Sequence, residues 1–250
     1  MQLVFDNRFY PADTLLVGAS SRGLRYGDGL FETMKVRDGE LLHASFHFDR
    51  LWDGLSVLGL PAPFSRQGLM DSILELSALN GHSASARVRL NVFRGEPVHH
   101  IIETFPLSTA PAADGLEIGV YPHGRKAFDA FSNLKHNNYL VYILAADWAR
   151  AQGLDEALVL NAHERVADAA TSNVFWVRSG ELFTPPLSEA GVAGVTRRVL
   201  MERFPVREAT VTPPALLEAD EVFLTNAIRG VRWVRRFGER EYGHVFSAGI

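Results

Sequence analysis

The sequence of 250 residues contains no cysteine, which excludes disulfides, thiolate metal sites and a thiol nucleophile. It also carries little net charge, −4 in total, and its acidic and basic residues are interspersed. No basic face or polybasic run therefore indicates a nucleic-acid or lipid partner. Residues 1–6 lack the apolar core of a signal peptide, and no apolar run approaches the ~20 residues of a membrane span. We expect a soluble, cytoplasmic protein that binds neither nucleic acid nor membranes.

A metal site is not expected either. The pairs His43/His47 and His99/His100 are more typical of solvated or hydrogen-bonded histidines than of metal ligands. The glycine-rich segment from Tyr26 onwards matches neither a calcium loop nor a Walker loop, and it is typical of a turn that enters a strand.

The hydrophobic content of 47% is sufficient for one large core or two modest ones. The first part of the chain shows strand alternation and two helices, one capped by Ser45 and one running from about Ser65 to Leu79. Periodicity is lost over 123–133, which we interpret as a linker. After it, further elements are predicted at Asn137–Ala151, Ala157–Leu160, Val174–Val177, Glu181–Thr184, Thr196–Arg203 and Glu221–Leu224. The pattern predicts an α+β protein with a smaller domain over 1–122 and a larger domain over 134–250.

Three motifs in the second half suggest one kind of chemistry. Lys135 precedes a strongly apolar run that can bury its amine. Asp168 follows in Val-Ala-Asp-Ala-Ala-Thr-Ser-Asn-Val-Phe (166–175), and Gly-Val-Thr-Arg (194–197) supplies a glycine, two amides and a hydroxyl before a helix, where a phosphate dianion binds well. Each residue alone also has an ordinary structural interpretation: Lys135 as a solvated lysine, Asp168 as a turn aspartate and Thr196 as an N-cap threonine. An amine to condense with an aldehyde, a carboxylate for a ring nitrogen and a phosphate cradle together describe a pyridoxal phosphate site.

In this order the motifs resemble those of the fold-type IV pyridoxal phosphate enzymes, which include branched-chain and D-amino acid aminotransferases and aminodeoxychorismate lyase. The resemblance extends from about Arg22 to Val234 and implies a two-domain α+β fold with pyridoxal 5'-phosphate as cofactor. It also implies a homodimer, in which a loop of the neighbouring subunit, here including residues 94–100, completes each active site.

The resemblance further implies roles for single residues. Lys135 would carry the cofactor, and Asp168, where the family usually has glutamate, would hold the ring nitrogen, with Glu164 as a weaker substitute. Arg50 would pair with the phosphate from the first domain. The remaining positions are phosphate contacts at Val195, Thr196, Thr225 and Asn226, and wall residues at Tyr26, Phe31 and Thr33.

The reaction depends on the substrate pocket. Thr33 and the segment Lys-His-Asn-Asn (135–138) are closer to aminodeoxychorismate lyase, which converts 4-amino-4-deoxychorismate to p-aminobenzoate and pyruvate in folate biosynthesis. Lyases and D-amino acid aminotransferases carry a further arginine in the loop 94–100 for a substrate carboxylate, and here that further arginine is absent; Arg89 and Arg229 are candidates to replace it. We favour the lyase. The alternative is an aminotransferase acting on branched-chain or D-amino acids with 2-oxoglutarate, and a cofactor-binding protein without turnover is a remote third reading, motivated by the short side chain of Asp168.

Overall fold

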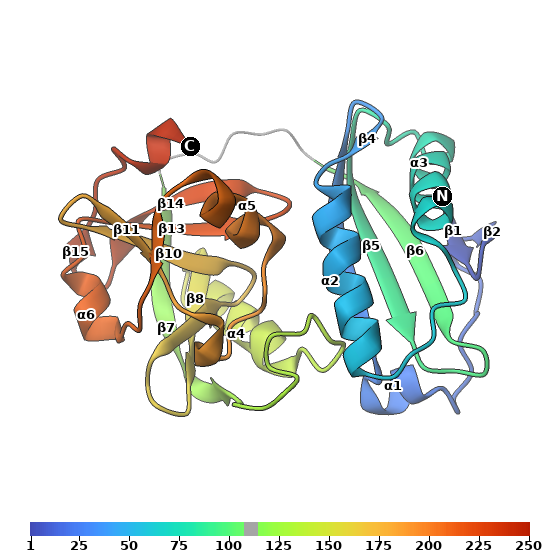
Figure 1. Cartoon of the computed structure of the whole chain (residues 1–250), viewed down its shortest axis with the longest axis horizontal. Coiled ribbons are helices and arrows are strands. Elements are labelled where there is room, and N and C mark those ends of the chain that lie inside the picture. Colours follow the sequence, from blue (N-terminus) through green and yellow to red (C-terminus); the bar gives the residue numbers. More distant parts are fainter. Residues whose placement is uncertain (108–114) are drawn as a thin grey trace. The chain divides into compact units, whose positions relative to one another are not determined.

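The computed structural model describes residues 1–107 and 115–250 and divides the chain into two compact units (Figure 1). The first unit comprises Met1–Ala110 and Leu134–Asn138, and the second comprises Pro111–Asn133 and Tyr139–Ile250. These boundaries differ from the predicted ones. Strand β7 (Leu116–Lys126) extends into the predicted linker at 123–133, because its last two residues pair with the end of strand β8 (Glu156–Asn161). Its first three residues pair with strand β14 (Gly230–Phe237).

The first unit is built on a six-stranded antiparallel sheet in the order β2-β1-β6-β5-β3-β4. One tight turn follows directly from the local sequence: Asp38 and Gly39 have positive φ angles of 52° and 78°, as a type I′ hairpin requires. The elements are β1 (Gln2–Phe5), β2 (Arg8–Pro11), α1 (Arg22–Tyr26), β3 (Gly29–Arg37), β4 (Glu40–Leu41), α2 (Ala44–Val57), α3 (Arg66–Leu79), β5 (Ser85–Phe93) and β6 (His99–Pro106).

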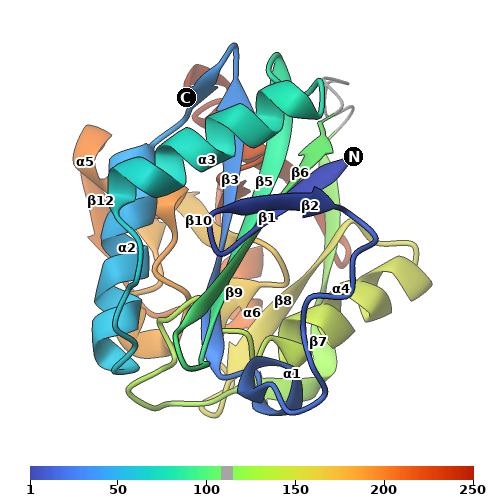
Figure 2. The same ribbon diagram turned by 90° about the vertical axis from the view of Figure 1, so that its right-hand side faces the viewer.

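Helices α2 and α3 pack on one face of this sheet (Figure 2). Ser65 caps α3 through a 3.0 Å hydrogen bond that its Oγ accepts from the Gly68 N–H, close to the predicted start. Ser45 does not cap α2, and that prediction is wrong: His43, with a left-handed φ of 54°, occupies the cap position and makes no side-chain cap. Because side chains alternate along a strand, Met34 lies under the helices and Phe31 lies on the opposite face.

The second unit contains a nine-stranded mixed sheet, in which eight strands follow the order β12-β11-β10-β13-β14-β7-β8-β9 and β15 pairs with β14. Helix α4 packs on β7 and β8, and α5 packs on the apolar residues of β10 and β13. Within the described ranges, no helix is long and apolar enough to cross a membrane. The other elements are α4 (Leu140–Ala151), β9 (Val166–Ala169), β10 (Asn173–Arg178), β11 (Glu181–Thr184), η1 (Leu187–Glu189), α5 (Val195–Arg203), β12 (Val206–Glu208), α6 (Pro213–Leu217), β13 (Glu221–Asn226), β15 (Arg240–Glu241) and η2 (Ser247–Gly249).

Candidate active site

Lys135 is fixed to the first unit by its own backbone. Its carbonyl oxygen accepts a 2.8 Å hydrogen bond from the Phe31 N–H, and the Asn137 N–H donates to the Gly29 carbonyl at 2.9 Å. This short segment pairs with the start of β3, which is why 134–138 belongs to the first unit. Glycine is required at Gly29, because an added Cβ would lie 2.1 Å from the Val92 carbonyl oxygen and 2.8 Å from Asn137 Nδ2. The glycine-rich motif therefore lets the lysine segment dock.

Two cations lie against the ring of Phe31. Lys135 Nζ is 4.4 Å from the ring centroid, and the guanidinium carbon of Arg89 is 4.3 Å from it. Thr33 is the direct partner of Arg89 in the β3–β5 ladder, so their side chains are neighbours on the same face. The structure thus brings together four predicted site residues, Phe31, Thr33, Arg89 and Lys135, on the sheet face away from α2 and α3.

Arg50 lies on the helix-covered face instead. Its guanidinium donates two hydrogen bonds to the buried carboxylate of Glu32, at 2.7 and 2.5 Å, and His47 Nδ1 lies 2.7 Å from the same carboxylate. Burial alone would raise the pKa of Glu32, but Arg50 and His47 lower it to about 2. Arg50 is therefore held in place by an ionised glutamate that the sequence did not single out. Tyr26 is exposed at the end of α1, with its ring beside the Arg22 guanidinium.

In the second unit, Asp168 is buried on β9 and accepts three hydrogen bonds. The donors are the Tyr142 hydroxyl at 2.9 Å, the Val192 N–H at 2.7 Å and the Asn173 amide at 2.7 Å. Burial raises the pKa of Asp168 to about 6 against these donors and the nearby Lys126 ammonium. The substitute candidate Glu164 is excluded, because its side chain is 65% exposed and pairs with Arg125 at 2.7 Å.

The predicted phosphate turn lies at the start of α5. Val195 is the first helical residue, and Gly194, the N-cap, provides no side-chain cap, so the first N–H groups of the helix remain available to an anion. Thr225, the β13 residue paired with Asn173 of β10, has a buried Oγ1 with no hydrogen-bond partner among the described residues. Because a buried hydroxyl without a partner is costly, this atom is suited to a ligand.

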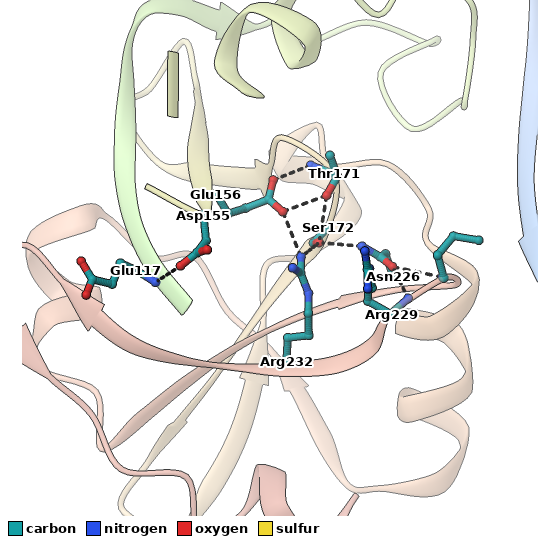
Figure 3. Close-up of polar contacts among 9 residues, drawn as sticks. Glu117, Asp155, Glu156, Thr171, Ser172, Asn226, Arg229 and Arg232 are labelled. Atoms are coloured by element: carbon teal, nitrogen blue, oxygen red, sulfur yellow. Dashed lines mark hydrogen bonds and ion pairs between the residues drawn. The ribbon is translucent and has the colours of Figure 1, made fainter. Parts of the chain in front are cut away.

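The side chain of Asn226 forms hydrogen bonds within its own turn (Figure 3), and its predicted phosphate contact stays a prediction. Its Oδ1 accepts hydrogen bonds from the backbone N–H groups of Ile228 and Arg229, at 3.1 and 2.8 Å, and its Nδ2 donates to Ser172 Oγ at 3.1 Å. Its side chain is thus committed to shaping the turn after Thr225. Arg232, which pairs with Glu156 at 3.1 Å, supports the same cluster. Arg229 is exposed on the turn.

The residues of the second unit suit pyridoxal phosphate. An uncapped helix start and a hydroxyl without a partner match a phosphate, and Asp168, with about four lone-pair positions and three donors, retains one for a ring N–H. No group of three or more histidine or acidic side chains that would hold a metal occurs in the described part of the chain.

Two residues with a role in the site, Glu32 and Asn173, were not predicted from the sequence. Asn173 lies in the motif at 166–175, but only its hydrogen bonds to Asp168 and Val192 distinguish it from any other residue at the start of a strand.

Comparison with known proteins identifies the family. Residues 29–237 match the amino-transferase class IV family. The chain is 30% identical to a putative branched-chain-amino-acid aminotransferase of Methanocaldococcus jannaschii (90% of this chain, 84% of that protein) and 30% identical to aminodeoxychorismate lyase of Vibrio harveyi (86% and 85%). Its fold is similar to the crystal structure of 4-amino-4-deoxychorismate lyase from Pseudomonas aeruginosa, with a TM-score of 0.81 and 32% identity over 96% of this chain and 93% of that one. The chain therefore belongs to the amino-transferase class IV family and is a pyridoxal phosphate-dependent enzyme.

Proposed function

We propose that this enzyme is a lyase that converts 4-amino-4-deoxychorismate to p-aminobenzoate and pyruvate. The observation that supports the proposal is the pairing of Thr33 with Arg89 on the sheet face that also carries Phe31 and Lys135. A hydroxyl and a guanidinium side by side suit a substrate that bears a carboxylate and must exchange protons. A branched aliphatic side chain would be matched better by apolar residues at these two positions.

Residues of the first unit hold the cofactor, bind the substrate and move protons. When bound, pyridoxal phosphate supplies an electron sink that acidifies the C–H bond of the amino-bearing carbon. In the first unit, Lys135 holds the cofactor and, once released, takes up this proton as a general base. Arg89 binds a substrate carboxylate through its guanidinium fork, and the Thr33 hydroxyl assists proton movement. Loss of the proton with cleavage of the neighbouring C–O bond expels enolpyruvate, which takes up a proton to become pyruvate, and leaves an aromatic ring.

The second unit contributes binding and electrostatics. The N-terminus of α5 at Val195–Thr196 and the hydroxyl of Thr225 bind the phosphate. Asp168, when ionised, accepts a hydrogen bond from the ring N–H and keeps that nitrogen protonated, which strengthens the electron sink. Arg50, held by Glu32, remains a proposed phosphate contact of the first unit, and Arg229 a second proposed carboxylate contact.

The test is direct. Purified enzyme is incubated with 4-amino-4-deoxychorismate while p-aminobenzoate is measured, and in parallel with a panel of branched-chain and D-amino acids plus 2-oxoglutarate. We expect p-aminobenzoate and no rapid transamination. Transamination at ordinary rates without p-aminobenzoate would establish the aminotransferase, which the similarity to the M. jannaschii protein supports. Cofactor binding without either reaction would indicate the non-catalytic protein.

We also propose that the enzyme is a homodimer, in which the loop at 94–100 helps to complete the neighbouring active site. Light scattering should give twice the chain mass. A monomer that keeps full activity on dilution would contradict this proposal.

A further inference from the structure

Asn173 makes contacts in three directions from the first position of β10. It is buried, and its Nδ2 donates one hydrogen bond to Asp168 Oδ1 at 2.7 Å and another to the Val192 carbonyl oxygen at 2.8 Å. Its Oδ1 lies against Gly194, where an added Cβ would fall 1.8 Å from that oxygen. Its backbone is paired with Thr225.

These contacts form a closed set. The Val192 N–H donates to the second oxygen of Asp168 at 2.7 Å, while the Val192 carbonyl accepts from Asn173, so Asp168, Asn173 and Val192 are each bonded to the other two. The set leads two residues later to Gly194, the N-cap of α5. The orientation of the amide is fixed by chemistry, because a flipped amide would direct its oxygen at two acceptors.

We infer that Asn173 is a positioning residue that fixes the Asp168 carboxylate relative to the Gly194 turn, so that the ring nitrogen and the phosphate of one cofactor are held by a single rigid set of contacts. Asparagine suits this position for two reasons. Its amide supplies two donors from one atom, and its small carbonyl side fits against a residue that has no Cβ. The inference rests on the cofactor site and is independent of whether the reaction is elimination or transamination.

The experiment compares ligands that occupy one end or both ends of the site. Apo enzyme is titrated with pyridoxal phosphate, with pyridoxal and with inorganic phosphate, for wild type and Asn173→Ala. We expect the affinity for pyridoxal phosphate to fall about ten- to hundredfold, the usual value of a hydrogen bond to a charged group. Affinity for inorganic phosphate should change less than about threefold, because the α5 amides and Thr225 remain in place.

Two further variants separate positioning from stability. Asn161→Ala is the matched control, since Asn161 is also buried and its Nδ2 donates to a carboxylate and a carbonyl, those of Glu189, at 2.6 and 3.2 Å. It should lose comparable thermal stability and keep the affinity for pyridoxal phosphate. Asn173→Asp preserves the shape of the side chain but replaces the Nδ2 donor with a carboxylate oxygen that cannot donate. This variant should bind the cofactor as poorly as Asn173→Ala. If Asn173→Ala does not fold, Asn173→Ser takes its place.

The inference is overturned if Asn173→Ala or Asn173→Asp binds pyridoxal phosphate as wild type does. It is also overturned if affinity for inorganic phosphate falls by the same factor, because Asn173 would then only shape the turn. A wild-type enzyme that binds pyridoxal phosphate but releases no p-aminobenzoate would refute the proposed reaction and leave this test intact.

Discussion

The titration of Asp168 predicts a pH dependence of stability that a single substitution should remove. In the folded protein, burial raises the pKa of Asp168 from its ordinary value of 3.8 to about 6. The folded state therefore holds this proton more tightly than the unfolded state. The resulting stabilisation is fully present below pH 3.8 and is lost as the pH rises through about 6. Since one pKa unit corresponds to about 1.4 kcal/mol, the loss amounts to about 3 kcal/mol.

The perturbation is Asp168→Asn in the apo enzyme. The variant has no proton to lose at this position, so its free energy of unfolding lacks this contribution. Urea unfolding followed by tryptophan fluorescence at a series of pH values from 4 to 7 gives the free energy of each protein. The difference, wild type minus variant, should decrease by about 2 kcal/mol across this range, because part of the stabilisation has already been lost at pH 4. Groups common to both proteins, such as Glu32 with its pKa of about 2, cancel in the difference.

Parallel pH profiles for the two proteins would refute the reasoning, because they would mean that Asp168 titrates alike in the folded and unfolded chains. Lys126 offers an internal check. Its buried ammonium lies 5.1 Å from the ring centroid of Tyr142, which donates to Asp168, and its charge lowers the pKa of Asp168 against the effect of burial. Lys126→Met should therefore extend the loss of stability to a higher pH.

Three further substitutions test separate parts of the site. Lys135→Ala should abolish the yellow colour of the cofactor–enzyme linkage and turnover together, and an unchanged visible spectrum would reject Lys135 as the cofactor lysine. Thr33→Val removes a hydroxyl at nearly constant shape and should lower p-aminobenzoate formation by about 10²–10⁴ with the spectrum intact, whereas a merely packed hydroxyl would leave the rate unchanged. Thr225→Val should weaken pyridoxal phosphate binding while leaving the apo enzyme equally stable or more so, because a buried hydroxyl without a partner is removed; unaltered affinity would exclude Thr225 from the phosphate site.

Structural features that depend on a few neighbouring residues could be predicted from the sequence. The helix that starts near Ser65 and the strand Glu181–Thr184 occur as expected, and Asp38–Gly39 forms the tight turn that such a dipeptide favours. Turn signals, caps and strand alternation act over a few residues, so the sequence contains the whole cause of each. The start of α5 beside Gly194 belongs to the same class, since the motif that suggests an anion site is also the motif that begins the helix.

The pairing of strands that are distant in the chain could not be predicted from the sequence. Strand β7 extends through part of the predicted linker because the distant strand β8 pairs with its last residues, and strands β6 and β14 were not predicted. The segment around Lys135 looked like the start of the second domain, yet its backbone bonds assign it to the first unit. Such outcomes depend on which strands meet, which no short window of residues specifies.

The sequence by itself determined the chemistry available to this protein: one lysine, one carboxylate and one helix start in an order that identifies a pyridoxal phosphate enzyme. Tertiary structure alone decided how those groups are held. Glu32 ionises because Arg50, 18 positions away, reaches it, and Asp168 keeps a raised pKa because burial outweighs three donors brought from α4, β10 and the segment before α5. Residue types fix which bonds are possible, whereas burial and the pairing of distant strands fix which of them form and at what electrostatic cost.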